Sequence, residues 1–181
     1  MSPQGSGGAR RAAIAVGKLG RPHGTRGEIK LDAFFDTDVI ERLVGARLIL
    51  TRITPPFRRE LVFQSLRPGP GRDIAKFEGY DAPETVREIT NCSVAAPREL
   101  MPALPPGRYY TEEIIGLPVT DPGGAPLGVL AAVIPAGGRD VWEIRAPNGG
   151  ETLIPCSPGT LVSVDMERGI IVMRPPAMEE E

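Results

Sequence analysis

The segment GKLGRPHGTRGEIK, from Gly17 to Lys30, is the most distinctive stretch of the chain. It holds four glycines, one proline and five basic or imidazole side chains, and it leads directly into the alternating stretch Glu28–Phe34. Glycine tolerates the backbone angles of tight turns, and strict alternation of apolar and polar residues is typical of a half-buried strand. The segment therefore predicts a long hairpin loop that enters a β-sheet with one face on the core.

Short strand-like segments continue on both sides of this hairpin, each bounded by Gly, Pro or Asp. In the N-terminal half they are Ala12–Lys18, Glu28–Phe34, Arg47–Ile53, Glu60–Leu66, Ile74–Phe77 and Ser93–Ala96. One helix is predicted at 82–90, because Asp81 precedes it as an N-cap and Glu84 has capping-box spacing. The N-terminal half therefore reads as a β domain with one short helix.

The C-terminal half also alternates strand-like segments with turns. The segments are GLPVT, PLGVLAAVI, VWEIR, ETLIP, LVSVD and IIVMR, separated by DPGG, PAGGRD, NGG and MERG. Gly and Pro make up 42 of the 181 residues (22 and 20), about twice the usual share of ~12%. Five or six short strands with tight turns predict a small barrel, because closure removes exposed sheet edges.

These patterns predict an all-β protein of two small barrels. The predicted divisions are a disordered tail at 1–9, an N-terminal barrel at 10–97, a Pro-rich linker at 98–108, a second barrel at 109–175 and an acidic tail at 176–181. The formal net charge of −2 is divided unevenly between the halves. Residues 1–100 carry 16 Lys/Arg against 12 Asp/Glu (+4), and residues 101–181 carry 5 against 11 (−6). The two halves are therefore expected to bind different partners.

The sequence offers little for catalysis or for a metal or cofactor. It has a single histidine, His23, and two cysteines, Cys92 and Cys156, without CxxC spacing. No GxxxxGK[ST] or GxGxxG loop precedes a helix. No apolar run approaches the ~18 residues of a membrane helix, and the N-terminus lacks the apolar centre of a secretory signal. We expect a cytoplasmic, non-catalytic protein with both cysteines in the core; a hydrolase or transferase that uses His23 is the catalytic alternative.

The basic side chains of the Gly17–Lys30 segment have two interpretations. Their guanidinium groups suit phosphate oxygens, and the glycines let another backbone approach closely. Alternatively, the loop is polar only because it faces water. A second basic group would extend a phosphate-binding side if it shared that face; it consists of Arg52, Arg58, Arg59, Arg67, Arg72 and Lys76. Phe57 either stacks on a base or anchors a loop, and burial statistics favour the anchor.

Aromatic residues mark the second half. Adjacent residues of a strand face opposite sides, so one of Tyr109 and Tyr110 would pack inward while the other faces a partner. The alternative is that both tyrosines anchor the linker. Trp142 lies between apolar residues in DVWEIR and is expected in the barrel core or at its rim rather than on a binding surface.

Two motifs resemble the bacterial RimM family, the ribosome maturation factors also called 16S rRNA-processing proteins. The first is VGKLGRPHGTRGEIKL followed by FFDTD, and the second is RYYTEEIIGLPVTDPGGAPLGVL through ETLIPC. The resemblance implies a six-stranded N-terminal barrel similar to those of translation factors, followed by a PRC barrel. It also implies a non-enzymatic assembly factor that acts as a monomer on the immature small (30S) ribosomal subunit.

Partners and site residues follow from the same resemblance. Proteins of this family bind the head of the immature subunit, contact ribosomal protein nineteen of that subunit, and aid folding and processing of 16S rRNA. Carried over by motif, Arg21, His23 and Arg26 would contact ribosome or RNA, and Tyr109 and Tyr110 would contact the ribosomal protein. A general RNA-binding β-barrel remains the alternative, and it would bind unrelated RNA with a steep salt dependence.

Overall fold

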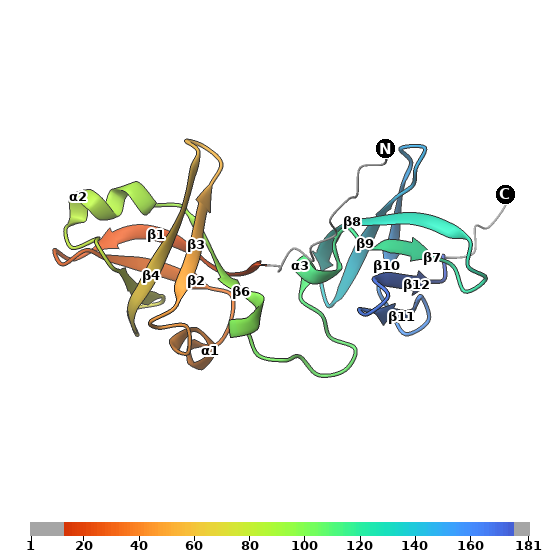
Figure 1. The fold of residues 1–181 in the computed structure, drawn as a ribbon, viewed down its shortest axis with the longest axis horizontal. Helices are drawn as coiled ribbons and strands as arrows, with labels where there is room; N and C mark the ends of the chain where they lie inside the picture. Colours follow the sequence, from red (N-terminus) through yellow and green to blue (C-terminus); the bar gives the residue numbers. More distant parts are fainter. Residues whose placement is uncertain (1–12, 176–181) are drawn as a thin grey trace, which may run out of the picture. The chain divides into compact units, whose positions relative to one another are not determined.

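The computed structural model describes residues 13–175 of the 181-residue chain (Figure 1). The tails predicted at 1–9 and 176–181 lie outside the described residues. The chain divides between Ala103 and Leu104 into two compact units, here called unit 1 and unit 2. No helix of residues 13–175 is long and apolar enough to cross a membrane.

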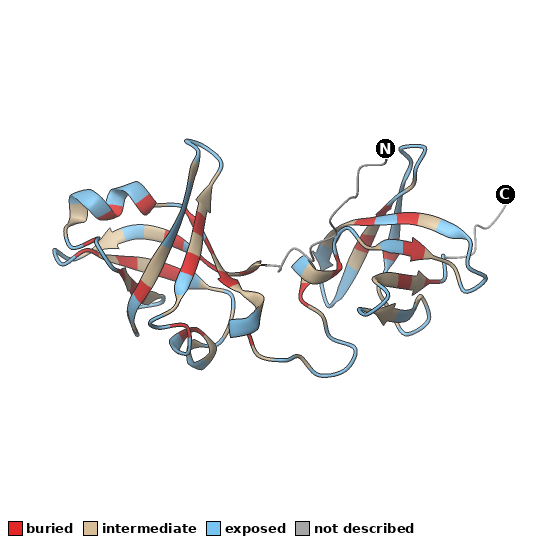
Figure 2. Cartoon of the chain, viewed as in Figure 1, coloured by how far each residue is buried: buried red, intermediate tan, exposed pale blue. Residues whose placement is uncertain are grey.

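Unit 1 is a closed antiparallel barrel of six strands. In chain order they are β1 (Ala13–His23), β2 (Glu28–Ala33), β3 (Arg47–Arg52), β4 (Phe57–Arg67), β5 (Asp73–Phe77) and β6 (Ser93–Pro97). The strands close in the order β1-β2-β5-β4-β3-β6. The alternation predicted for the strand after the hairpin is confirmed: Ile29 and Leu31 are buried, whereas Asp32 is exposed (Figure 2).

Strand β1 is longer than predicted. It continues from Ala13 to His23, so most of the predicted loop is strand and only residues 24–27 form the turn. Glycine and proline normally interrupt strands, but here Gly17 pairs with Ala33 where β1 and β2 run close together. A Cβ added at Gly17 would lie 2.8 Å from the Asp32 carbonyl oxygen. Gly17 therefore permits close strand approach rather than a turn.

The predicted helix exists in a shorter and differently capped form. It consists of α2 (Pro83–Val86) and the 3₁₀ turn η1 (Arg87–Ile89). The predicted cap was wrong: Ala82 is the N-cap, and the Thr85 hydroxyl bonds the Ala82 carbonyl at 2.8 Å. Asp81 instead pairs with Lys76, at 2.9 Å between carboxylate and ammonium. The Asp81 carboxylate, which the sequence pattern assigned to helix capping, thus forms an ion pair with a lysine of β5.

Other short helices in the described residues were not predicted. They are α1 (Thr37–Glu41), the 3₁₀ turn η2 (Arg98–Leu100) and α3 (Thr111–Ile114). The η2 turn occupies the first part of the predicted linker, and the following Met101 is buried. Residues 102–110 have no helix or strand, in keeping with their prolines.

Unit 2 is a six-stranded sheet around its own core. Its strands are β7 (Pro118–Thr120), β8 (Pro126–Ala136), β9 (Arg139–Arg145), β10 (Glu151–Pro155), β11 (Leu161–Asp165) and β12 (Ile170–Met173). Their order is β10-β9-β8-β7-β12-β11, with β7 and β12 parallel and the other neighbours antiparallel. The pairing of Ala136 with Arg139 leaves only Gly137 and Gly138, both with positive φ, to make the β8–β9 turn.

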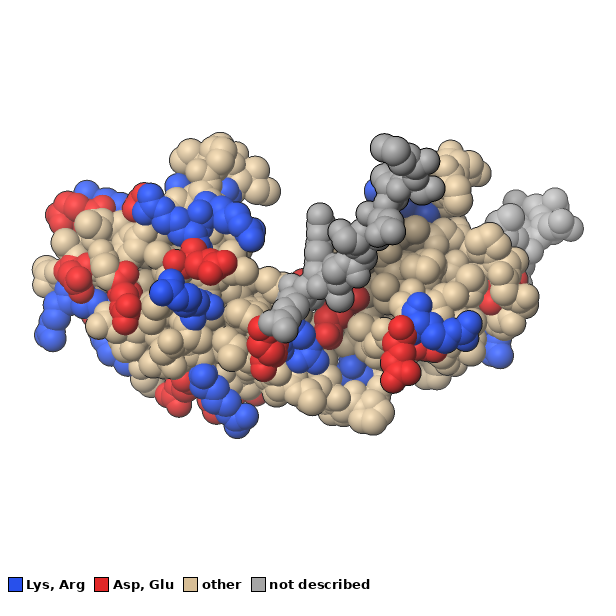
Figure 3. Space-filling model, viewed as in Figure 1, with Lys and Arg blue, Asp and Glu red and all other residues tan. Residues whose placement is uncertain are grey.

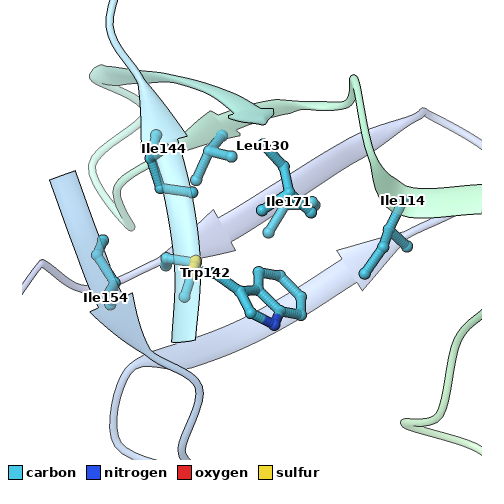
Figure 4. Packing of buried hydrophobic residues seen from close by; sticks show 8 residues of the cluster. Ile114, Leu130, Trp142, Ile144, Ile154 and Ile171 are labelled. Carbon is cyan, nitrogen blue, oxygen red and sulfur yellow. The ribbon is translucent and has the colours of Figure 1, made fainter. Parts of the chain in front are cut away.

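The single tryptophan, Trp142, lies in the core of unit 2. Trp142 on β9 is 4% exposed and packs in a cluster with Leu130, Ile144 and Ile171 (Figure 4). Ile114 of α3 closes the same cluster beside the indole. The structure thus places Trp142 in the core, as the sequence indicated.

Candidate nucleic-acid interface

An irregularity in β1 sets the direction of its basic side chains. Leu19 pairs with Leu31 and Pro22 pairs with Ile29, so two residues of β1, Gly20 and Arg21, stand opposite the single residue Lys30. Such a β-bulge bends the strand and re-aims a side chain. Strict alternation would point Arg21 inward like Leu19, two residues earlier. Because of the bulge, Arg21 is exposed instead, beside Lys30.

The bulge forms one wall of an open depression of about 520 Å³ on unit 1. Its lining comes from β1, β2, the β4–β5 loop and the turn before β6, and consists of Gly20, Arg21, Lys30, Pro70, Gly71, Arg72 and Asn91. Three of these side chains are cationic and none is acidic. The depression is therefore a positively charged surface built from segments that are distant in sequence.

The cations of the depression are only weakly neutralised. Within residues 13–175, no hydrogen bond or ion pair engages the side chain of Arg21 or of Lys30. Arg72 lies 3.6 Å from Asp32, with both side chains about half exposed (50% and 55%). Exposed ion pairs of this kind contribute little to stability, so an anionic ligand can replace Asp32 as the partner of Arg72 at low cost. The site therefore keeps a positive charge available to an anion.

The turn that follows β1 is shaped by two glycines. Gly24 and Gly27 have φ of 62° and 75°, the left-handed region that other residues adopt at a cost. A Cβ on Gly27 would in addition overlap the carbonyl oxygen of Tyr80, so the turn packs directly against the chain at Tyr80–Asp81. These glycines hold the end of the hairpin against the barrel.

His23 and Arg26 lie in a different environment from Arg21. In the register of β1 and β2, His23 stands opposite Glu28. The Glu28 carboxylate accepts two hydrogen bonds from Arg67, at 2.8 and 2.7 Å. Arg67 is the largest cause that lowers the pKa of Glu28, and the charges of His23 and Arg26 lower it further. Neither His23 nor Arg26 lines the depression. Of the three sequence-predicted residues, the structure thus places only Arg21 there.

Acidic side chains pair with several members of the second basic group. Arg67 pairs with Glu28, Lys76 with Asp81, and Arg59 with Glu88 at 3.1 Å. Arg72 alone of this group lines the depression, and Arg58 is exposed on β4. Lys30 and Arg72 belong to the two basic groups that the sequence singled out, whereas Asn91 is a site residue that sequence reasoning missed. Figure 3 shows how densely positive and negative side chains alternate over unit 1 on the face in view.

The ring of Phe57 is in contact with two arginine side chains. The guanidinium carbons of Arg52 and Arg59 lie 5.6 and 5.3 Å from the centre of its ring. These cation–π contacts cover an aromatic face that a nucleotide base would otherwise use. The anchoring interpretation of Phe57 is therefore the better one.

The tyrosine pair of unit 2 divides into one buried and one half-buried ring. Tyr110 is 5% exposed, and it precedes α3 rather than lying on a strand, so strand alternation is not the cause. Tyr109 lines an open depression of about 400 Å³ together with Trp142, Asp140 and Cys156. Only Tyr109 of the pair lines this surface.

The two thiols are not activated. Cys92 is buried and Cys156 is half-buried against the core of unit 2, as expected for small core residues. Burial is the main cause that raises the pKa of each thiol above its ordinary value. A nucleophilic cysteine requires the opposite shift, toward the thiolate.

The geometry defines a class of protein: a closed β-barrel with an accessible basic surface, followed by a second small β unit with an aromatic-lined depression. Comparison with known proteins identifies the family. Residues 14–101 match the RimM N-terminal domain, and residues 111–178 match the RimM PRC barrel domain. The chain belongs to the RimM family of ribosome maturation factors.

Two ribosome maturation factors support the assignment over most of the chain. The ribosome maturation factor RimM of Geobacillus kaustophilus is 32% identical over 160 residues, which cover 88% of this chain and 91% of the relative. That of Coxiella burnetii (strain RSA 331) is 34% identical over 165 residues, covering 88% and 93%. A crystal structure described as a 16S ribosomal RNA processing protein RimM from Pseudomonas aeruginosa shares 28% identity, covering 89% and 96%, with a TM-score of 0.43.

Proposed function

We propose that this chain is a non-enzymatic, cytoplasmic ribosome assembly factor that binds the head of the immature small (30S) subunit as a monomer. In this role it contacts ribosomal protein nineteen of that subunit and aids folding and processing of 16S rRNA. The observation that carries the proposal is the accessible basic depression of unit 1, in a chain whose relatives are named ribosome maturation factors.

The charges of the two halves support a division of labour. The N-terminal half (+4, from 16 Lys/Arg and 12 Asp/Glu) suits RNA, and the C-terminal half (−6, from 5 and 11) suits a basic ribosomal protein. Arg21, with His23 and Arg26 at the neighbouring turn, is proposed to face the ribosome. Tyr109 is proposed as the aromatic contact for the ribosomal protein, and Tyr110 as the buried residue that supports it.

Cosedimentation of the full chain with small subunits tests the proposal. We expect binding to immature particles and much weaker binding to mature ones, because an assembly factor must leave the finished subunit. Equal binding to both, or binding to neither, would contradict it. A general RNA-binding barrel would instead bind mature particles and unrelated RNA equally well.

The partner assignment has its own test. Tyr109→Ala should weaken binding of isolated ribosomal protein nineteen to the full chain by about tenfold or more, as loss of an aromatic anchor does. Lys30→Gln on unit 1 is the matched control and should leave this binding unchanged. If Tyr109→Ala has no effect, the tyrosine pair is not the protein contact.

A further inference from the structure

We propose that the depression lined by Arg21, Lys30 and Arg72 is a binding site for a backbone phosphate of RNA. The proposal rests on the function proposed above and deepens it, because it assigns binding to Lys30, Arg72 and Asn91. His23 and Arg26 are not part of this site; their charges act on Glu28 at the neighbouring hairpin turn, where they lower its pKa.

Three independent segments bring the cations to one place. The β-bulge turns Arg21 outward beside Lys30 of β2. Arg72 reaches the same point from the β4–β5 loop, where a Cβ added to Gly20 would lie 3.5 Å from Lys30 Cβ and 3.6 Å from an Arg72 guanidinium nitrogen. The guanidinium of Arg72 therefore lies next to the bare backbone of Gly20, as the stem of Lys30 does.

Asn91 adds a neutral donor held in a fixed turn. Its backbone adopts φ of 62°, and its N–H donates to the Leu19 carbonyl at 3.1 Å. The Leu19 N–H in turn donates to the Cys92 carbonyl at 2.8 Å. These bonds fix Asn91 to β1 at the residue before the bulge, so its amide stands at the rim of the depression.

The chemistry of the lining favours a phosphate group over a nucleotide base. Two guanidinium groups, an ammonium and an amide give a set made mostly of hydrogen-bond donors, which matches the several acceptor oxygens of a phosphodiester. Among the described residues that line the depression, none is aromatic, so a nucleotide base finds no ring on which to stack. The site therefore fits the backbone of RNA without reading its sequence.

The salt dependence of RNA binding tests the site. The probe is a fluorescently labelled transcript of the head domain of 16S rRNA, bound to the full chain at several salt concentrations. Lys30→Gln and Arg72→Gln should each weaken binding severalfold and reduce the slope of log K against log salt by about 0.7–0.9. Asn91→Asp, which places a carboxylate at the rim, should weaken binding at least as much.

Arg47→Gln is the matched control, because it removes the same charge from an exposed position on β3 outside the depression. It should leave the slope nearly unchanged. If Lys30→Gln and Arg72→Gln behave like Arg47→Gln, the phosphate site is wrong, although binding of the unmodified chain to immature particles would still support the proposed function. If the chain does not bind immature particles, yet the variants reduce the salt dependence of transcript binding as predicted, the assembly role is wrong and the phosphate site is supported.

Inorganic phosphate separates an RNA site from a site for the free anion. Backbone amide resonances of Gly20, Lys30, Gly71 and Asn91 should shift on addition of the transcript, and inorganic phosphate should shift them only weakly. Saturation by inorganic phosphate at micromolar concentration, combined with unchanged RNA slopes in the variants, would overturn the assignment to RNA.

Discussion

Gly27 is under two constraints, whereas Gly24 in the same turn is under one. Both have positive φ, but a Cβ on Gly24 would lie no closer than 3.7 Å to any atom, the nearest being an oxygen of Glu28. Gly24→Ala should therefore cost only the backbone term of about 1–2 kcal/mol of unfolding free energy. Gly27→Ala adds the overlap with the Tyr80 carbonyl and should cost roughly 2–5 kcal/mol. Chemical denaturation of the two variants measures the difference, and equal losses would contradict the packing argument.

The Glu28–Arg67 pair predicts a pH dependence of stability. Because Arg67 lowers the pKa of Glu28 in the folded state, the pair stabilises the fold above the unfolded pKa of about 4.5. That contribution is lost as the pH falls through the lower, folded pKa. Arg67→Met should move the pKa of Glu28 upward, as measured by NMR titration of its carboxyl group.

The stability of this variant provides a second readout. The difference in unfolding free energy between the unmodified chain and Arg67→Met should be full at neutral pH and should shrink below pH 4.5. Lys76, whose ammonium pairs with Asp81, provides the comparison Lys76→Met, which should leave the pKa of Glu28 where it is. A stability difference that stays constant with pH would show that Arg67 acts by packing alone.

At the scale of elements, Arg52 joins the β3–β4 hairpin to the end of η1. Its guanidinium donates to the carbonyls of Pro55, Glu88 and Thr90, at 3.1, 3.0 and 2.7 Å. Carbonyls at the end of a helical turn lack partners within the helix, so Arg52 satisfies groups that would otherwise remain open. One planar side chain thus fixes the turn that leads into β6.

Arg52→Lys keeps the charge but not the planar fork, so it should lower the unfolding free energy by about 1–3 kcal/mol. Amide exchange at Thr90 and Cys92, whose N–H groups bond within this turn, should become faster. Arg58→Lys on the neighbouring strand is the control and should change stability by less than about 0.5 kcal/mol. Unchanged exchange in Arg52→Lys would show that the turn does not depend on these bonds.

The elements show what sequence patterns capture and what they miss. Alternation located β2, β3, β6 and β10 to within a residue or two, because a half-buried strand must alternate. It missed the extension of β1 through Gly20 and Pro22, because a bulge depends on what the partner strand contributes. Asp81 was assigned to a helix cap because the local pattern does not include Lys76, which reaches it from β5.

In the candidate site too, sequence patterns captured local features and missed contacts between distant segments. Arg21 was identified because it lies within the glycine-rich segment, whereas Arg72 and Asn91 are about 50 and 70 residues away in the sequence and meet it only through barrel closure. Charge counting identified the N-terminal half as the more basic one. It treated Arg67 and Arg59 as equal to Arg72, although the first two are paired with glutamates. Glu28 of β2 and Glu88 of η1 reach these arginines only in the folded barrel, so the folded structure decides which cations remain available.

At the scale of the whole molecule, the two units differ in how much apolar surface they bury. The buried hydrophobic residues of unit 1 fill a closed barrel and include Phe63 and Phe77, whose ring centres are 5.4 Å apart. Unit 2 has a smaller set around Trp142, and its sheet ends at β10 and β11, where Leu153 and Val162 are 56% and 46% exposed. Because stability scales with buried apolar area, unit 2 should unfold first.

The single tryptophan makes this order measurable in the full chain. Fluorescence of Trp142 reports unit 2 alone, whereas methyl resonances of Ile29 and Leu50 report the core of unit 1. We expect the fluorescence transition at a lower urea concentration than the methyl transition. Ile154→Ala should move only the fluorescence midpoint to still lower urea, by an amount that corresponds to about 2–5 kcal/mol. Coincident midpoints in the unmodified chain, moving together in the variant, would show that the two units unfold as one cooperative structure.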